Sequence, residues 1–209
     1  MKLPGKTIER LSQYRRILLN CLATGKTHIY SHELADMLNL TAVQVRRDIM
    51  LMGYSTSQKK GYDINELIKV IGSILDTRKG QNVAVVGVGN LGRAITGYFM
   101  GKRSKLNIVA TFDNDPAKVN RVISGVNCYP VKELADRIRE LNITIAVLTV
   151  PPDHAASVAE ELVIAGIRGI LNFTSVPVNI SPHVYLEDYD MITSLEKVAY
   201  FTKKNSLVS

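Results

Sequence analysis

A strand, a glycine turn and a helix follow one another near the middle of the chain, and this pattern constrains the fold most. The apolar residues 83–86 lead directly into the glycine motif 87–92, and a helical pattern continues over residues 93–100. In a G-x-G-x-x-G motif, Gly87 permits the tight turn, Gly89 lets a pyrophosphate approach the backbone, and Gly92 lets the helix pack closely on the strand. The N-terminus of that helix also suits a diphosphate. The pattern predicts a Rossmann-like dinucleotide-binding unit.

An acidic residue stands where such a unit needs one. Residues 107–112 predict a second strand, and Asp113 follows it, 21 positions after Gly92. An acid about 20 residues beyond the glycines accepts hydrogen bonds from the ribose hydroxyls. The next residues are Asn114 and Asp115 rather than an arginine, so the sequence favours NAD or NADH over the 2′-phosphorylated cofactor. A glycine-rich loop without a ligand is the alternative.

The second part of the chain alternates between strand and helix patterns. The expected strands are residues 83–87, 108–112, 143–150 and 168–173, and the expected helices are residues 91–101, 131–141 and 154–165. Continuously apolar strands of this kind are typical of a parallel sheet that is covered on both faces. Ligands bind beyond the C-terminal ends of such strands, and Asp113, Thr149, Pro151 and Asn172 fall at these ends, so we expect them to form the pocket wall. A short strand is expected at 183–186 and a last helix at 194–203, which would dock on another subunit or domain.

The N-terminal part predicts a helix-turn-helix. Apolar stripes indicate helices at residues 7–21, from Ser31 to about residue 38, and from Thr41 to about residue 52. Ser31 and Thr41 are the expected N-caps, and Gln44 would complete a capping box. The third helix is expected to turn Val43, Val45, Ile49, Met50 and Met52 inward and Gln44, Arg46, Arg47 and Asp48 outward. Glutamine can pair with adenine and arginine with guanine in the major groove, although Gln44 serving only as a cap and the arginines as a solvated face are the alternatives.

A polar stretch follows the third helix. Residues 54–62 are too polar for a core element and would form a β-hairpin, the wing of a winged helix, with Lys59 and Lys60 placed to contact phosphates. A fourth helix begins near residue 63. The candidate DNA-binding residues are therefore Ser31, Thr41, Gln44, Arg46, Arg47, Lys59 and Lys60. Because the pattern breaks at residues 76–81, we expect a winged-helix domain at 1–78, a Rossmann-like domain at 82–190, and a C-terminal helix and tail for dimerisation at 191–209.

Charge divides the chain in the same way. The first 80 residues hold 13 Lys and Arg against 7 Asp and Glu, and the remaining residues hold 13 against 12, so the N-terminal part carries six of the seven net positive charges. A basic module of this size indicates a polyanionic partner, nucleic acid first. A solvated basic surface without a partner is the alternative.

Other classes of protein are not favoured. No apolar run reaches the length of a membrane span, and the first ten residues lack the apolar core of a secretory signal. Cys21 and Cys128 are expected to be free thiols of a cytoplasmic protein. Neither cysteines nor histidines cluster with metal-ligand spacing, so no metal is expected.

Seven short motifs, taken together in order, resemble the Rex family of redox-sensing transcriptional repressors. They are S-x-E-L-A from residue 31, V-Q-V-R-R-D from 43, G-Y-D-I from 61, V-V-G-V-G-N-L-G-R-A from 85, F-D-N-D-P-A-K-V from 112, L-T-V-P from 148 and G-I-L-N-F from 169. The resemblance runs from about Leu3 to Phe201. It implies a homodimer that binds a palindromic operator as a repressor, releases it when NADH replaces NAD, and exchanges its C-terminal helix between subunits.

The resemblance also implies roles for individual residues. The adenosine and diphosphate would be held by Gly87, Gly89, Asn90, Leu91, Gly92, Asp113, Asp115 and Lys118. The nicotinamide side would be approached by Thr149, Val150, Pro151, Asn172 and Phe173, and the operator by Gln44, Arg46 and Arg47. Contacts that switch with ligand state would involve Arg16, Tyr98 and Asp190.

Two rival functions start from the same residues. An NAD-dependent oxidoreductase with a basic appendage would need a general acid or base beside the nicotinamide, and His154 is the only histidine near a strand end, where it is more simply explained as a helix-start residue. A CoA- or nucleotide-binding accessory domain without a DNA role would leave the basic capped helix unexplained. We therefore expect no catalytic residue, and a repressor rather than an enzyme.

Overall fold

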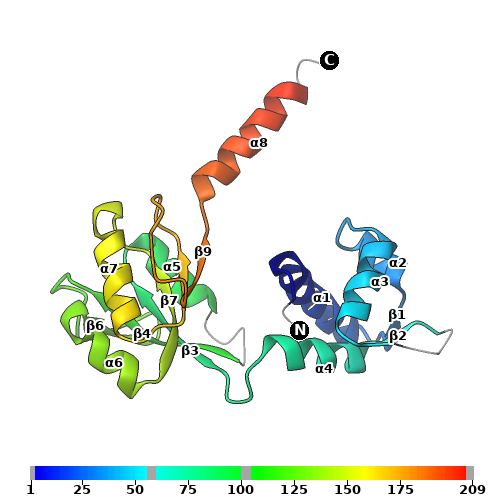
Figure 1. The fold of residues 1–209 in the computed structure, drawn as a ribbon, viewed down its shortest axis with the longest axis horizontal. Coiled ribbons are helices and arrows are strands. Elements are labelled where there is room, and N and C mark those ends of the chain that lie inside the picture. Colours follow the sequence, from blue (N-terminus) through cyan, green and yellow to red (C-terminus); the bar gives the residue numbers. More distant parts are fainter. Residues whose placement is uncertain (1–2, 56–59, 100–104, 206–209) are drawn as a thin grey trace. The chain divides into compact units, whose positions relative to one another are not determined.

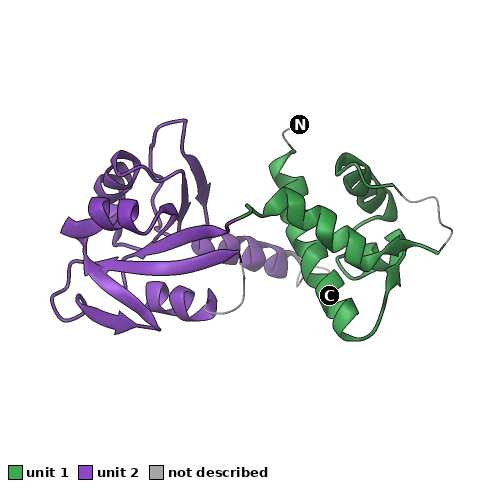
Figure 2. Ribbon diagram, turned by 90° about the horizontal axis from the view of Figure 1, so that it is seen from below, with its two compact units in different colours: residues 1–78 green, residues 79–209 purple. Residues whose placement is uncertain are grey.

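The computed structural model describes residues 3–55, 60–99 and 105–205. The chain forms two compact units, residues 1–78 and residues 79–209 (Figure 2). Among the described residues, no helix is both long enough and apolar enough to cross a membrane. Each unit has a hydrophobic core of its own.

The first unit is a helical domain with a two-stranded sheet. Its elements are α1 (Gly5–Ala23), β1 (His28–Ile29), α2 (Ser31–Asp36), α3 (Ala42–Leu51), β2 (Tyr62–Asp63) and α4 (Ile64–Leu75). The apolar stripes of the sequence become one core, in which Leu11, Leu34 and Ile71 are fully buried. The four helices that the sequence predicts are present. The expected N-cap of the second helix was wrong, because α2 already starts at Ser31 and Tyr30 is its N-cap residue.

The strand at the end of the stretch where a wing was expected has a partner that was not expected from the sequence. Tyr62 pairs with Ile29 in an antiparallel β1–β2 sheet, so β2 is held by the segment before α2. Gly61 adopts φ +88°, and a Cβ there would lie 2.8 Å from the Ile29 carbonyl oxygen. Two-residue strands are too short to produce a periodic pattern, which is why β1 escaped detection. Lys59 lies outside the described residues, and Lys60 is exposed.

Two residue assignments on α3 were wrong. Asp48 was expected to face solvent with the arginines, but it is fully buried. Val43 and Met50 were expected to face the core, but they are 66% and 75% exposed. The charged side chain of Asp48 is tolerated in the core because α1 supplies hydrogen-bond donors to it, and a stripe analysis of α3 alone cannot see those donors.

The second unit is a seven-stranded, mostly parallel sheet with helices on both faces (Figure 1). Its strands are β3 (Gln81–Val86), β4 (Leu106–Asp113), β5 (Arg121–Ile123), β6 (Val126–Pro130), β7 (Ile143–Leu148), β8 (Gly169–Asn172) and β9 (Tyr185–Asp188), in the order β5-β6-β4-β3-β7-β8-β9. Its helices are α5 (Asn90–Phe99), α6 (Leu134–Glu140) after the short 3-10 helix η1 (Val131–Glu133), α7 (Pro152–Ile164) and α8 (Met191–Asn205).

The central strand, β3, is continuously apolar because both of its faces are packed. Ala84 and Val86 pack into the core that contains α6 and α7 residues, whereas Val83 and Val85 pack on the opposite face with Ile95 of α5. Because β3 lies between β4 and β7, the chain leaves the sheet in opposite directions on its two sides. This is the switch point at which α/β sheets bind ligands.

The antiparallel β5–β6 hairpin was not predicted. Its turn is Ser124-Gly125, with φ +50° and +83°, as a two-residue hairpin turn with two positive φ values requires. The turn residues were visible in the sequence, but the strands on either side are short and partly polar. β7 is also shorter than expected, because it ends at Leu148 and α7 begins at Pro152.

Candidate functional site

The glycine loop between β3 and α5 is built from three glycines with different constraints. Gly87 adopts φ +94°, and a Cβ there would lie 2.7 Å from the Thr149 carbonyl oxygen. A Cβ on Gly92 would lie 2.0 Å from the Gly87 carbonyl oxygen, so only glycine lets α5 start against the loop. A Cβ on Gly89 would meet nothing within 4 Å. Gly87 and Gly92 are thus needed by the fold itself, and Gly89 leaves open space above the loop.

Asp113, at the end of β4, is joined directly to this loop. Its carboxylate accepts hydrogen bonds from the backbone N–H of Val88 at 2.8 Å and of Asp115 at 2.9 Å, and from Lys118 Nζ at 3.1 Å. Burial by itself raises the pKa of Asp113, but these three donors outweigh burial and hold the pKa below its usual value. The hydrogen bond that Lys118 donates to Asp113 in turn raises the pKa of Lys118. The site therefore presents an ionised, partly satisfied carboxylate at the mouth of the loop.

Lys118 is shared between two carboxylates. It lies 3.1 Å from Asp113 Oδ2 and 3.5 Å from Asp115 Oδ2. One positive charge against two negative charges leaves this cluster net negative, and a net negative cluster repels a phosphate group.

These groups border a cavity of 520 Å³, a volume typical of small-molecule sites. The predicted site residues that line it are Gly87, Gly89, Asp113, Lys118, Thr149, Val150 and Pro151. It is also lined by Asn114, Val131, His154, Ser157, Val158 and Glu161, none of which the sequence analysis included in the cofactor site. Val131 follows β6, and the last four of these residues lie on α7. No sequence motif marks them, and only the order of the strands in the sheet could have predicted that they line the cavity.

The remaining predicted cofactor residues do not line this cavity. Asn90, Leu91 and Gly92 form the first turn of α5, and Asp115 lies beside Lys118. Asn172 is buried at the end of β8, where its Nδ2 donates to Val176 O and Asp188 Oδ1 and its Oδ1 accepts from Thr174. Its polar atoms are therefore engaged within the β8–β9 connection. The ring of Phe173 packs 5.1 Å from that of Tyr189, measured between centroids.

Thr149 links the loop to β7. Its hydroxyl donates to the Gly87 carbonyl oxygen at 2.7 Å, with the Val86 carbonyl oxygen at 3.1 Å. The side chain thus fixes the turn at Gly87 as well as lining the cavity.

In the first unit, the start of α3 has the expected cap. Thr41 Oγ1 accepts from the Gln44 backbone N–H at 3.1 Å. The expected capping box is wrong, however, because the Gln44 side chain does not return to Thr41. Its Nε2 donates to Asp48 Oδ1 at 3.0 Å, one turn along the helix.

Asp48 is the centre of a buried polar network that joins α3 to α1. Arg10 donates to both carboxylate oxygens, at 2.6 Å and 2.8 Å, and the Tyr14 hydroxyl donates at 2.8 Å. Burial by itself raises the pKa of Asp48, but the hydrogen bonds from Arg10 and Tyr14 outweigh it and lower the pKa below its usual value. Neither Arg10 nor Tyr14 was singled out from the sequence.

The outward face of α3 carries the two arginines. Arg46 and Arg47 are exposed, and Arg46 NH1 donates to Ser31 Oγ at 3.2 Å, which links α3 to the start of α2. Together with Val43, Met50 and Leu51 they line a hollow of 470 Å³.

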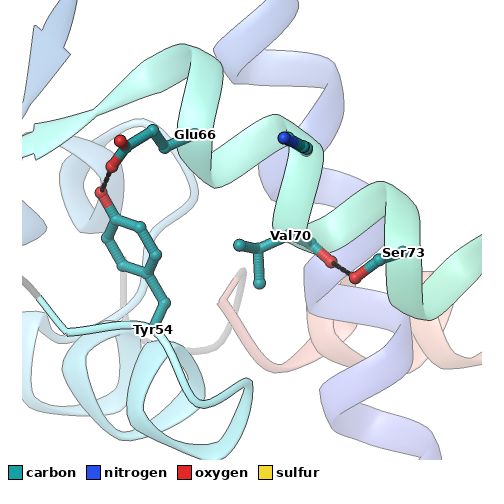
Figure 3. Close-up of a pocket in the computed structure, with 5 residues that line it drawn as sticks. Tyr54, Glu66, Val70 and Ser73 are labelled. Atoms are coloured by element: carbon teal, nitrogen blue, oxygen red, sulfur yellow. Dashed lines mark hydrogen bonds between the residues drawn. The ribbon is translucent and has the colours of Figure 1, made fainter.

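A second hollow in this unit, of 310 Å³, lies between Tyr54 and α4 (Figure 3). The Tyr54 hydroxyl donates to Glu66 Oε2 at 2.9 Å, and burial together with this carboxylate raises the pKa of Tyr54 to about 12. The bond fixes the segment that leaves α3 against α4.

The three expected switch residues lie on separate elements. Arg16 is exposed on α1, and Tyr98 is 62% exposed near the end of α5, where its ring contacts that of Phe99. Asp190 accepts from the backbone N–H groups of Ile192 and Thr193 and so caps α8. No group of residues in the described part of the chain has the composition of a metal site.

Both parts of the chain are similar to known proteins. Residues 2–49 match the family model of a putative DNA-binding protein N-terminus, and residues 78–176 match that of a CoA binding domain. The redox-sensing transcriptional repressor Rex of Geobacillus kaustophilus is 37% identical over 202 residues, which cover 97% of this chain and 94% of that protein. The chain belongs to the Rex family of redox-sensing transcriptional repressors.

Solved Rex-family structures show the same fold. The repressor RSP in complex with β-NAD⁺ and operator DNA is 32% identical, with a TM-score of 0.91 over all of this chain and 96% of that one. RSP in complex with β-NADH is 31% identical, with a TM-score of 0.86 over all of this chain and 98% of that one. The expected winged-helix and Rossmann-like architecture of a Rex protein is confirmed.

Proposed function

We propose that this Rex-family chain is a cytoplasmic repressor that binds a palindromic operator as a homodimer and is released when NADH binds. The observation that carries the proposal is the glycine loop closed by Asp113 over a 520 Å³ cavity, in a chain whose other unit exposes two arginines on a capped helix. RSP, its structural neighbour, binds β-NAD⁺, β-NADH and operator DNA.

The residues of the cavity fit a dinucleotide. The open space above Gly89 and the N-terminus of α5 would accept the pyrophosphate, and the Asp113 carboxylate would accept from the ribose hydroxyls. Val131 and Val158 would face the adenine. Asn90, Leu91, Gly92, Asp115 and Lys118 support this half of the site by holding the loop and the carboxylates. The negative ribose end favours NAD(H) over NADP(H).

The redox preference would arise at the nicotinamide end. The oxidised ring carries a positive charge that the reduced ring lacks, and taking that charge out of water costs free energy. Walls formed by Thr149, Val150 and Pro151, with Asn172 and Phe173 at the end of the next strand, would favour the neutral ring of NADH.

The first unit would contact the operator through α3. Gln44, Arg46 and Arg47 would face the major groove, while Ser31, Thr41, Lys59 and Lys60 would contact its borders. Because the Asp48 carboxylate can only accept, it fixes Gln44 with the amide nitrogen inward. The Gln44 oxygen and its second N–H remain for an adenine edge.

Release requires that NADH and operator favour different dimers. Arg16, Tyr98 and Asp190 would exchange contacts between ligand states, and α8, whose Leu195, Val198 and Phe201 are all more than half exposed, would pack on the partner. A coupling free energy of about 1–3 kcal/mol changes affinity about 5–150-fold, and operator must weaken NADH binding by the same factor.

The decisive experiment selects bound duplexes from a random pool and titrates the best one with NADH and with NAD at fixed salt. A palindromic site that NADH releases, and NAD does not, is the expected result. NADH affinity is then measured with and without operator, and equal affinities would rule out the coupling.

The second candidate is an NAD-dependent oxidoreductase, which one observation favours: His154 lines the cavity. We expect no enzymatic activity, because His154 lies in the first turn of α7, where its backbone N–H bonds to Pro151 O, and its presence there is explained by the helix start. His154→Ala should leave release by NADH intact. Selection of no operator, together with hydride transfer that this variant loses, would favour the enzyme.

A further inference from the structure

The outward face of α3 combines apolar and basic side chains. Val43 is 66% exposed and Met50 is 75% exposed, and the two exposed arginines lie between them at helical spacing. The opposite face, with Val45, Asp48 and Ile49, is buried. The helix therefore exposes two large apolar side chains to solvent that do not contribute to the core.

Each polar neighbour of Val43 makes at least one hydrogen bond within the unit. Gln44 donates to Asp48 at 3.0 Å, Thr41 caps the helix, and Arg46 donates to Ser31 at 3.2 Å. Val43, the second residue of α3, has no comparable packing role. It borders the same hollow as Arg46 and Arg47.

Chemistry and position together indicate what such a side chain contacts in DNA. A recognition helix presents its N-terminal residues to base edges. The 5-methyl group of thymine is the apolar feature of the major groove. Two arginines on the same helix face can neutralise the flanking phosphates or donate hydrogen bonds to guanine. Met50, by contrast, lies seven residues further along, at the C-terminal end of α3.

We propose that Val43 contacts a thymine 5-methyl group in each operator half-site and so makes this repressor selective for thymine at that position. The inference rests on the proposed operator binding and adds a specificity-determining residue to it. Replacing that thymine by deoxyuridine removes only the methyl group. The loss per half-site should be about fourfold in affinity, the equivalent of one buried methyl group.

The test uses the full-length protein and its selected operator. Each thymine is replaced in turn, symmetrically in both half-sites, by deoxyuridine, and affinities are measured for the native chain, Val43→Ala and Met50→Ala. One position should cost the native chain about fourfold per half-site. Val43→Ala should bind both duplexes equally, and Met50→Ala should retain the penalty.

The outcomes separate this inference from the proposed function. An operator that is bound and released by NADH, but shows no penalty at any thymine or an undiminished penalty in Val43→Ala, would overturn the role of Val43 alone. A penalty that disappears in Met50→Ala instead would also overturn it. Failure to select any operator would overturn the proposed function as well. Thermal unfolding of Val43→Ala should match that of the native chain, since the side chain is exposed.

Discussion

Each unit contains a buried carboxylate that accepts several hydrogen bonds, but the two carboxylates have different surroundings. Asp48 is fully buried and is bonded by Arg10, Tyr14 and Gln44 within the first unit. Asp113 is 6% exposed and is bonded by two backbone N–H groups and Lys118 in the second. In both, the donors outweigh burial and lower the pKa of the carboxyl group.

The difference lies in what surrounds each carboxylate. Asp48 receives its donors from side chains of α1 and α3, so its charge serves to join two helices. Asp113 borders a cavity of 520 Å³ and receives two of its donors from backbone N–H groups, so part of the carboxylate faces a space that a ligand can enter. A lowered carboxyl pKa alone therefore does not distinguish a structural acid from a binding acid, whereas an adjoining cavity does.

Removing Asp48 should have the largest effect. Asp48→Ala leaves the Arg10 charge and the Tyr14 hydroxyl without their acceptor, and deleting one partner of a buried ion pair costs about 3–5 kcal/mol. Hydrogen exchange of α1 and α3 amides should accelerate, and operator binding should be lost, while NADH binding to the second unit persists. A loss of unfolding free energy below about 1 kcal/mol would show that Asp48 is not the link between these helices.

Removing Asp113 should affect binding rather than folding. Asp113→Ala removes the charged acceptor for the ribose, and a hydrogen bond to a charged group contributes about 1.5–3 kcal/mol, so NADH affinity should fall about 10–150-fold. Isothermal titration with NADH measures this, and operator binding should remain. Arg47→Ala is the matched control, because it should weaken operator binding and leave NADH affinity unchanged. Loss of both activities in Asp113→Ala would indicate a misfolded second unit.

Alanine substitutions at two glycines of the loop should distinguish an effect on folding from an effect on binding. Gly92→Ala forces a Cβ to within 2.0 Å of the Gly87 carbonyl oxygen, and overpacking of this kind costs about 1–3 kcal/mol of stability. Gly89→Ala meets no atom within 4 Å and should leave thermal unfolding unchanged, but its methyl group would occupy the space for the pyrophosphate. Equal NADH affinity in Gly89→Ala and the native chain would contradict the placement of the diphosphate.

Acid should produce the smallest effect. Because the pKa of Asp48 is lowered on folding, its ionised form stabilises the fold above its unfolded pKa of about 3.9, and this stabilisation is lost as pH falls through the lowered folded pKa. The stability difference between the native chain and Asp48→Asn should therefore shrink on acidification below about pH 4, as measured by denaturant unfolding. A difference that stays constant down to pH 2 would mean that folding does not lower the pKa of Asp48.

The fold was largely predictable because its determinants are local. The order of strand, glycine turn and helix at residues 83–100, the 3.6-residue stripes of α1 and α4, and the uneven charge are all visible in one dimension. The 21-residue spacing from Gly92 to Asp113 predicted an acid beside the glycine loop, and the structure brings Asp113 to that loop.

Only the tertiary structure decided which side chains on these elements are engaged. Asp48 is buried because donors 34 and 38 residues away on α1 reach it, and α7 contributes to the cavity because β7 lies next to β3 in the sheet. The same long-range packing turned Val43 and Met50 outward against the expected stripe. Sequence periodicity reports the face of one element, whereas burial, hydrogen bonding and cavities depend on which other element lies against that face.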